Sequence, residues 1–316
     1  MKIVIPGGTG QVGTFLARKF ISDGHDVVVL GRKAIAADWR VVGWDGETLG
    51  DWAREFESSD VVINLAGRNV NCRYNEENRR EIIASRVNST KVVGEAITTA
   101  SSPPKVWLQA STATIYAHRF DAPNDDITGI IGGAEPDVPE TWNFSIDVAK
   151  RWEQAAIEAP TPKTRKVLMR SAITLSPDRG GIFDVLLGLV RRGVGGTAGN
   201  GRQYISWIHD QDFVRSIYWL IEHEELSGAV NLAAPNPMPN KEFMSVLRQA
   251  WGTRIGLPAT EFMLGIAAIF MRTETELILK SRRVTPARML ESGFEFEFGS
   301  WEKAAKDLCR RWRERN

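Results

Sequence analysis

The sequence predicts an α/β fold, in which a doubly wound parallel sheet is followed by a smaller C-terminal α/β lobe. The chain has 316 residues, which is more than one small hydrophobic core requires. Its first 175 residues alternate short apolar runs with segments of helical spacing, as strands connected by helices do. The apolar runs are nearly continuous, and this is typical of parallel strands that are covered on both faces.

The alternation starts with the first residues of the chain. Lys2 to Ile5 predicts a strand, Gln11 to Ile21 a helix and Asp26 to Leu30 a second strand. Asp23-Gly24 ends the helix, because this dipeptide favours a turn. Strand, glycine loop, helix and strand together form a βαβ unit.

The same alternation continues to about residue 175. We expect strands at Asp60 to Ala66, Val106 to Ala110 and Lys166 to Leu175. Helices are expected between them, at Glu76 to Thr99 and Phe144 to Glu158. This order indicates a parallel sheet with helices on both faces.

After residue 176 the pattern changes. A glycine-rich stretch surrounds an apolar helix at Ile182 to Val190, and further helices are expected at Gln211 to Glu222, Asn240 to Trp251 and Glu261 to Ser281. The most apolar stretch, Phe262 to Met271, is too short to span a bilayer and predicts a buried helix. We therefore expect a first domain at residues 1–175 and a C-terminal lobe at 176–316, some segments of which return to the sheet.

Charge and cysteine content exclude several classes of partner. Lys plus Arg number 40 and Asp plus Glu number 39, so the net charge of +1 offers no attraction to nucleic acid or to an anionic membrane. The two cysteines, Cys72 and Cys309, form neither a disulfide framework nor a zinc motif. We also expect no signal peptide, because the first residues run directly into a strand and a glycine loop. We expect a cytoplasmic protein without a metal site.

The loop after the first strand carries the strongest motif. It reads Gly7-Gly8-Thr9-Gly10-Gln11-Val12-Gly13. Glycines at this spacing make a tight turn, let the backbone approach a pyrophosphate, and let the helix pack closely on the strand. The helix N-terminus then offers free N–H groups to the phosphates. The motif predicts a Rossmann dinucleotide site, with contacts to the cofactor from Gly7, Thr9, Gly10, Gln11, Val12 and Gly13.

The end of the second strand indicates which dinucleotide is bound. An NAD site has Asp or Glu there, which accepts hydrogen bonds from the ribose 2′-OH. This chain instead reads Gly31-Arg32-Lys33, and its cations suit a 2′-phosphate. NADP(H) is therefore favoured over NAD(H), with Gly31 and Arg32 at the site; the alternative is a pair of solvated surface cations.

Several motifs along the whole chain resemble one known family. They are the glycine loop, Val62 to Gly67, Ser85-Arg86-Val87, Ser111 to Tyr116, Gly199 to Gln203, Trp207 to Asp212, Asn231 to Pro237, and Pro286 to Phe296. Together they resemble the extended short-chain dehydrogenase/reductase superfamily. The closer resemblance is to its atypical "epimerase family" proteins, sometimes labelled sugar-nucleotide epimerases, which carry a C-terminal domain of unknown function.

The resemblance implies a Rossmann domain with bound NADP(H) and a cleft roofed by the C-terminal lobe. It places Leu65, Ala66 and Gly67 along the pyrophosphate and ribose of the cofactor, and Glu81 and Arg86 on a helix beside it. Arg86 would then contact the cofactor or a substrate anion. The alternative for Arg86 is a structural role, capping buried carbonyl groups.

The superfamily's usual catalytic groups are incomplete here. Its enzymes use a Ser or Thr together with a Tyr and a Lys in a Y-x-x-x-K step, in which the Lys lowers the pKa of the Tyr. Thr112 matches the Ser/Thr position, but none of the four tyrosines is followed by Lys four residues later. On the expected helix, Lys150 would put Ile146 at the Tyr position, and the other register puts Ser145 and Ala149 at the two positions.

Other residues are candidates for the missing chemistry. Asp147 is the first, because the family tends to have a carboxylate there, and Tyr116 is the second, because it follows the Thr112 strand. Arg202 could bind a substrate phosphate or carboxylate, Trp207 could line the substrate site, and His209 could carry a proton. Each has a structural alternative: a solvated helix carboxylate for Asp147, and packing or backbone contacts for the others.

Two functions follow. The first is an NADP(H)-dependent oxidoreductase or epimerase that acts on a small sugar-like or anionic molecule without the Tyr–Lys pair. The second is a non-catalytic NADP(H)-binding regulator or scaffold that contacts a partner protein. The oligomeric state and the identity of the substrate do not follow from the sequence.

Overall fold

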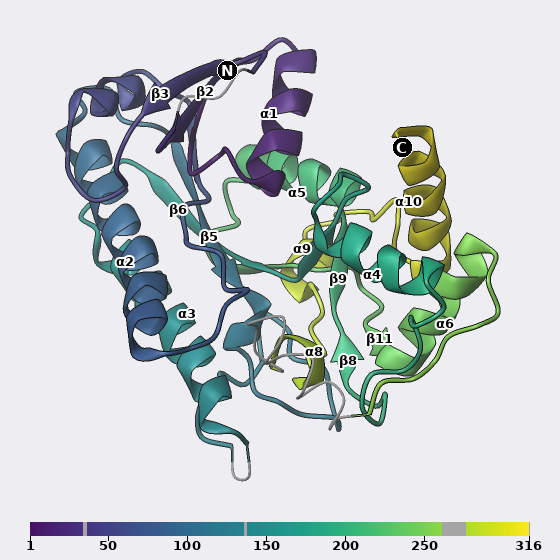
Figure 1. Cartoon of the computed structure of the whole chain (residues 1–316). Helices are drawn as coiled ribbons and strands as arrows, with labels where there is room; N and C mark the ends of the chain where they lie inside the picture. The colour runs from purple at the N-terminus through teal and green to yellow at the C-terminus, as the bar shows by residue number, and fades with distance from the viewer. Residues whose placement is uncertain (34–36, 136–137, 261–275, 316) are drawn as a thin grey trace.

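A seven-stranded parallel sheet forms the centre of the protein (Figure 1). The computed structural model describes residues 1–33, 37–135, 138–260 and 276–315. The strand order is β10-β6-β5-β4-β1-β2-β3, which reverses direction beside β1 as in a doubly wound sheet. The strands are β1 (Lys2–Pro6), β2 (Asp26–Gly31), β3 (Arg40–Gly43), β4 (Val61–Asn64), β5 (Val106–Thr112), β6 (Arg165–Ser171) and β10 (Gly228–Leu232). The predicted α/β Rossmann fold is confirmed.

Helices cover both faces of this sheet. α1 (Gln11–Ser22) and α5 (Asp210–Glu222) pack on one face, while α2 (Glu76–Thr99), α3 (Glu140–Glu158) and the 3-10 helix η1 (Asp51–Phe56) cover the other. Successive side chains of a strand point to opposite faces, so Ile3 and Ile5 join the first core and Val4 the second. A second 3-10 helix, η2 (Ala113–Ile115), follows β5 directly.

The C-terminal half also builds a smaller lobe, which stands at the right of Figure 1. Its core packs Phe243, Trp301 and Leu308, with the Phe243 and Trp301 rings stacked at 4.0 Å. The lobe's helices and short strands are β7 (Ile173–Leu175), α4 (Ile182–Arg191), β8 (Tyr204–Ile205), β9 (Trp207–His209), β11 (Met238–Pro239), α6 (Asn240–Trp251), α8 (Glu276–Leu279) and α10 (Trp301–Arg315). The short helix α9 (Ala287–Glu291) packs on β10 of the main sheet instead. β7 pairs with β9, and β8 with β11, in two separate two-stranded sheets.

Several elements differ from the sequence-based expectation. The run predicted as one strand from Lys166 to Leu175 is two strands, because after Ser171 the chain leaves the main sheet and β7 pairs with β9. β3 and β10 were not predicted, and β10 returns from the C-terminal half to pair with β6. Of the helix expected at Glu261 to Ser281, α8 lies within the described residues, while the stretch Phe262 to Met271 lies outside them.

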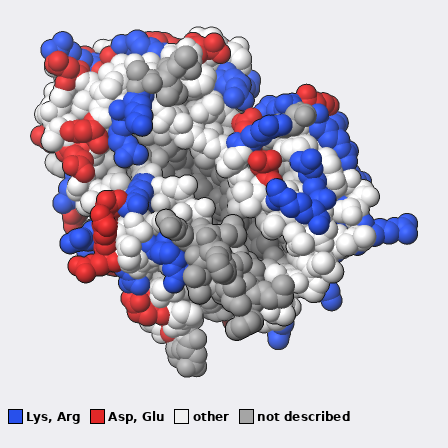
Figure 2. All heavy atoms as spheres, viewed as in Figure 1, with Lys and Arg blue, Asp and Glu red and all other residues white. Residues whose placement is uncertain are grey.

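Lys and Arg side chains gather over α10 on the face shown in Figure 2, and both signs mix over the sheet side. Within the described ranges, no helix combines the length and the apolar character needed to cross a membrane.

Candidate functional site

A cleft of about 730 Å³ lies at the carboxyl ends of β1, β2 and β4, where the crossing point of a doubly wound sheet is expected to bind ligands. We call it the glycine-loop cleft. Nine of the predicted cofactor residues line it: Gly7, Thr9, Gly10, Gly31, Arg32, Leu65, Ala66, Gly67 and Glu81. The first half of α2 forms its far wall through Ala84, Ser85 and Ser89.

Three glycines of the loop have different physical roles. Gly7 has φ +73°, and a Cβ there would lie 2.5 Å from the Ala66 Cα. A Cβ at Gly13 would lie 2.3 Å from the carbonyl oxygen of Gly8, so Gly13 lets α1 sit against the loop. A Cβ at Gly10, by contrast, would meet no atom within 4 Å. Gly10 therefore leaves open space at the N-terminus of α1, where the N–H groups of the first turn are free to bind an anion.

The side chains of Gln11 and Val12, two further residues of the loop, do not line the cleft. The side chain of Gln11 lies against Gly181 of the C-terminal lobe, so close that a Cβ at Gly181 would fall 1.9 Å from the Gln11 Nε2. Val12 packs against the core of the sheet. The predicted contacts of Gln11 and Val12 are therefore limited to their backbone N–H groups at the start of α1.

Arg32 stands exposed at one end of the cleft, near Trp44 and Asp45. Asp45 accepts hydrogen bonds from the backbone N–H groups of Glu47 and Thr48, at 2.8 and 2.9 Å, and from the Thr48 hydroxyl. These hydrogen bonds lower the pKa of Asp45 to about 2, and the one from the Thr48 hydroxyl has the largest effect. The carboxylate is thus committed to its own turn. Arg32 and Glu47 are the other charged side chains at this end of the cleft, and neither forms an ion pair within the described residues.

The far wall carries an ion pair. Glu81 pairs with Arg68, whose other guanidinium nitrogen donates to the Asn78 Oδ1 at 2.7 Å. The backbone N–H of Arg68 donates to the Ser85 hydroxyl at 3.0 Å. Glu81 therefore holds the loop after β4 against α2.

A smaller cavity of about 130 Å³ opens beside the cleft, and we call it the side cavity. Its polar lining consists of Tyr74, Arg86, Thr112, Thr114, Ser145 and Arg282. The cavity adjoins the cleft at Gly67 and Arg86, since a Cβ on Gly67, which lines the cleft, would lie 3.2 Å from the Arg86 Cζ. Predicted residues Thr112 and Arg86 are thus brought together in the side cavity.

Burial controls the ionisation of the groups in the side cavity. Burial lowers the pKa of Arg86 to about 10 and raises that of Tyr74 to about 12. The Ser145 hydroxyl donates to the fully buried carboxylate of Glu276, and the Thr112 hydroxyl accepts from the backbone N–H of Thr114 at 3.1 Å.

Sequence reasoning did not identify Tyr74, Arg282 or Trp44 as site residues. Tyr74 and Arg282 lie more than two hundred residues apart in the chain, and neither belongs to a spaced motif. Ser145 could have been predicted from the sequence, because one register of the helix puts it at the tyrosine position of the missing Tyr–Lys pair.

The other two catalytic candidates lie outside the side cavity. Asp147 is on the outer side of α3, with its side chain 45% exposed and 2.8 Å from Arg151. Tyr116 is buried, and its hydroxyl donates to the Asn231 Oδ1 at 2.9 Å and accepts from Arg170 at 3.0 Å. Burial raises the pKa of Tyr116. These contacts correspond to the structural alternatives, a solvated helix carboxylate and a packed aromatic residue.

The three predicted substrate residues also have contacts elsewhere. Arg202 is exposed, with its guanidinium 6.0 Å from the ring of Phe120. Trp207 is fully buried against Trp301 in the lobe core. His209 is fully buried, and its Nε2 lies 3.0 Å from Asp307, with burial lowering the pKa of the imidazole. The structure therefore does not bring Arg202, Trp207 and His209 together with Thr112.

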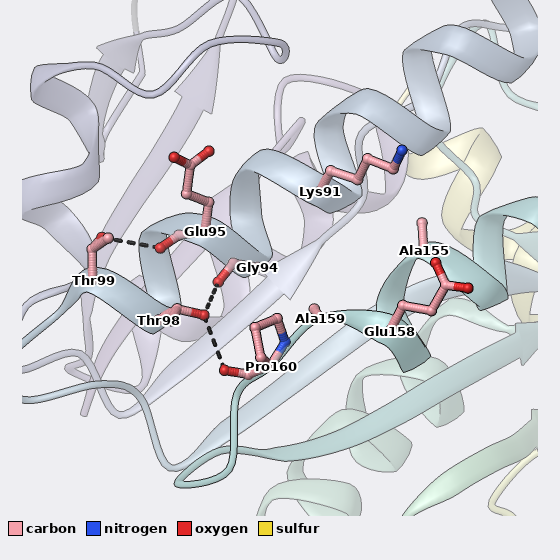
Figure 3. A pocket seen from close by; sticks show the side chains of 9 residues that line it. All are labelled: Lys91, Gly94, Glu95, Thr98, Thr99, Ala155, Glu158, Ala159 and Pro160. Atoms are coloured by element: carbon pink, nitrogen blue, oxygen red, sulfur yellow. Dashed lines mark hydrogen bonds between the residues drawn. The ribbon is translucent and has the colours of Figure 1, made fainter.

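A further hollow lies on the outer surface, between the C-terminal halves of α2 and α3 (Figure 3). The Thr98 hydroxyl there donates to the carbonyl groups of Gly94 and Pro160, at 2.8 and 3.2 Å. Lys91 and Glu158 extend along its edge. Its polar groups connect the two helices, and its lining shares no residue with the glycine-loop cleft.

Known proteins of one family are similar to this chain over nearly its whole length. Residues 3–131 match the NAD dependent epimerase/dehydratase family, and residues 259–308 match a domain of unknown function, DUF1731. Human epimerase family protein SDR39U1 is 31% identical, over 98% of this chain and 99% of the relative. Epimerase family protein YfhF of Bacillus subtilis is 30% identical, over 98% of each chain. The crystal structure of human SDR39U1 (isoform 2) with NADPH superimposes with a TM-score of 0.85 and 30% identity, over 98% of this chain and 99% of that one.

Proposed function

This chain belongs to the epimerase family proteins of the NAD-dependent epimerase/dehydratase type, and from that premise we propose that it binds NADP(H) and uses it in redox chemistry on a small sugar-like or anionic substrate. The observation that carries the proposal is the glycine-loop cleft, which joins Gly10, Arg32 and Leu65 to Gly67 in one hollow. The structure of the human relative with NADPH supports the same cofactor for this chain.

The residues of the cleft fit such a dinucleotide. The open backbone at Gly10 and the N-terminus of α1 suit a pyrophosphate, because both offer N–H groups without a side chain in the way. Arg32 suits a 2′-phosphate, since a guanidinium binds phosphate through paired hydrogen bonds. Asp45, being committed to its turn, offers less to a ribose 2′-OH.

The side cavity would hold the reacting part of the substrate. A bound nicotinamide supplies or accepts a hydride, and the protein must then orient a substrate oxygen and move a proton. The Thr112 hydroxyl would orient the oxygen, and Tyr74 is the tyrosine that lines the cavity in the described part of the chain. A phenol whose pKa is raised to about 12 keeps its proton until a strongly basic alkoxide develops, so Tyr74 would act as a proton donor in a reduction.

A titration of cofactor-free protein with NADPH and NADH tests the proposal. We expect NADPH to bind roughly tenfold to hundredfold more tightly than NADH, because the 2′-phosphate gains a charge-assisted contact. In Arg32→Ala the affinity for NADPH should fall to that for NADH. Arg54→Ala is the matched control, since Arg54 is exposed and pairs with Asp51 outside the cleft. Equal binding of both cofactors by the wild-type protein would contradict the role of Arg32.

One observation favours the second candidate, a regulator that binds NADP(H) without turnover. Lys150, the lysine on α3 in the register of the missing dyad, donates its Nζ to the carbonyl of Gly132 at 2.9 Å and so lies outside the side cavity. A regulator should capture a partner protein in the presence of NADPH and release it when the cofactor is removed. Capture that is independent of the cofactor would contradict this candidate.

A further inference from the structure

The side cavity is lined by two guanidinium groups, those of Arg86 and Arg282. None of the described residues that line it is acidic. A cation removed from water is costly unless an anion or several hydrogen bonds compensate it. The balance of charge in the cavity therefore depends on what each arginine contacts.

Arg86 has little compensation from the protein. Its Nη1 donates to the carbonyl of Ile82, one turn earlier on α2, at 3.1 Å, and its guanidinium lies 5.0 Å from the Trp152 ring centroid. Within the described part of the chain it forms no ion pair. A backbone carbonyl and an aromatic face stabilise a cation less than a carboxylate does, so Arg86 retains an excess of positive charge.

Arg282 shares its carboxylate neighbour with a second cation. Its Nε donates to the Thr114 hydroxyl at 3.1 Å, and its Nη2 lies 3.9 Å from Glu276. The same carboxylate also faces Lys280 at 3.7 Å. One buried carboxylate thus faces two cations at the wall of the cavity.

We propose that the side cavity binds the carboxylate of a small carbonyl acid, such as a 2-oxo acid, between Arg86 and Arg282. Two guanidinium groups facing one hollow are the arrangement that recognises a carboxylate through charge-assisted hydrogen bonds. Thr112 and Thr114 line the same hollow and provide hydroxyls for the neighbouring carbonyl oxygen. The redox role of this carbonyl rests on the proposed function, whereas binding of the carboxylate does not.

The size of the cavity supports a small acid. A cavity of roughly 150 Å³ accommodates a molecule as large as benzene. At about 130 Å³ the side cavity is slightly smaller than that, which suits an acid of a few carbon atoms and not a nucleotide. The junction at Gly67 and Arg86 would bring the carbonyl of such an acid next to the end of the glycine-loop cleft.

The test compares two ligands of similar shape by calorimetry, with and without saturating NADPH. 2-Oxobutyrate carries the carboxylate, and butanone carries the carbonyl alone. We expect 2-oxobutyrate to bind and butanone to bind at least tenfold more weakly. Arg86→Gln and Arg282→Gln should each weaken 2-oxobutyrate roughly tenfold to hundredfold. Arg283→Gln is the matched control, because Arg283 donates to the carbonyl of Phe120 and stacks on Tyr204.

Several outcomes would overturn the proposal of a carboxylate site. Equal affinity for the two ligands, or no binding of 2-oxobutyrate in either state, would show that no carboxylate site exists, and this arm needs no variant to fold. A tenfold loss of NADPH affinity in Arg86→Gln, with 2-oxobutyrate unaffected, would assign Arg86 to a cofactor phosphate. If uridine diphosphate competes with 2-oxobutyrate and binds more tightly, the cavity belongs to a nucleotide site. Failure of NADPH to bind would overturn the proposed function alone, since the cofactor-free arm still tests the carboxylate.

Discussion

Lys280 is among the most buried charged side chains of the described protein, with its side chain 1% exposed. Its Nζ donates to the carbonyl of Thr114 at 3.1 Å and lies 3.7 Å from Glu276. Burial is the largest influence and lowers the pKa of Lys280 to about 8, with Arg282 acting in the same direction and Glu276 and Glu135 against it. This residue should therefore make the stability of the protein depend on pH in the alkaline range.

The direction of this dependence follows from proton binding. Between about pH 8 and the ordinary lysine pKa of 10.5, the folded protein has released the proton of Lys280 while the unfolded chain still holds it. Stability gains from this group as pH rises through that window. The free energy of unfolding of the wild type minus that of Lys280→Met should increase by on the order of 1 kcal/mol per pH unit between pH 8 and 10. Urea unfolding at pH 7, 8, 9 and 10 measures this difference, and a constant value would contradict the lowered pKa.

In the glycine loop and the start of α1, one glycine is needed for folding and another for binding. Gly13 is needed for packing, since a Cβ there would meet the backbone of Gly8 at 2.3 Å. Gly10 is open and has φ −79°, a value that any residue adopts. The two positions are three residues apart, and alanine substitutions at them should have different consequences.

Gly13→Ala should lower the free energy of unfolding by about 1–3 kcal/mol, because α1 must move away from the loop. Gly10→Ala should cost less than about 1 kcal/mol, the difference between Gly and Ala at an N-cap. The new methyl group of Gly10→Ala should nevertheless weaken NADPH at least tenfold, because it occupies space in the glycine-loop cleft. Urea unfolding without cofactor and NADPH titration of both variants distinguish these effects. Unchanged NADPH affinity in Gly10→Ala would mean that the loop backbone does not approach the cofactor.

Among the secondary-structure elements, a long helix could be predicted from the sequence and two short edge strands could not. α2 begins and ends where its helical spacing predicts, at Glu76 and Thr99, because a long periodic segment carries its own signal. β3 and β10 were not predicted, because they are short strands at the two edges of the sheet. Their existence depends on the strand beside them and not on a long apolar run.

Some residues of the candidate site could be predicted from the sequence, and others could not. The glycine loop, Gly31 and Arg32 were predictable because their chemistry lies within consecutive residues. Tyr74 and Arg282 reach the side cavity only through the fold, from segments with no common spacing. Burial, which commits Trp207 and His209 to packing, is likewise a property of the tertiary structure.

For the whole molecule, the two halves of the sequence share one core. Residues after 175 contribute much of the cluster on the α1 face of the sheet: Ile208, Phe213, Val214, Ile217, Leu220, Leu226, Val230, Leu232, Met289 and Phe294. Phe15 of α1 meets Phe213 of α5 edge to face, with ring centroids 5.9 Å apart. β10 also closes the outer edge of the sheet through five residue pairs with β6. The division at residue 175 therefore separates sequence patterns that depend on each other for burial.

A fragment of residues 1–175 should consequently fail to fold cooperatively. It would expose the inner face of α1, since Phe15, Leu16 and Phe20 pack in the same cluster as the missing residues, and it would leave β6 as an unpaired edge. Losing one large buried side chain already costs about 3–5 kcal/mol, and a domain's total stability is about 5–15 kcal/mol. Thermal unfolding followed by circular dichroism, with dye binding to exposed apolar surface, should show no cooperative transition in the fragment and a clear one in the full chain. A fragment that unfolds cooperatively and binds NADPH would instead show that β1 to β6 and their helices form a core of their own, with the C-terminal half added to it.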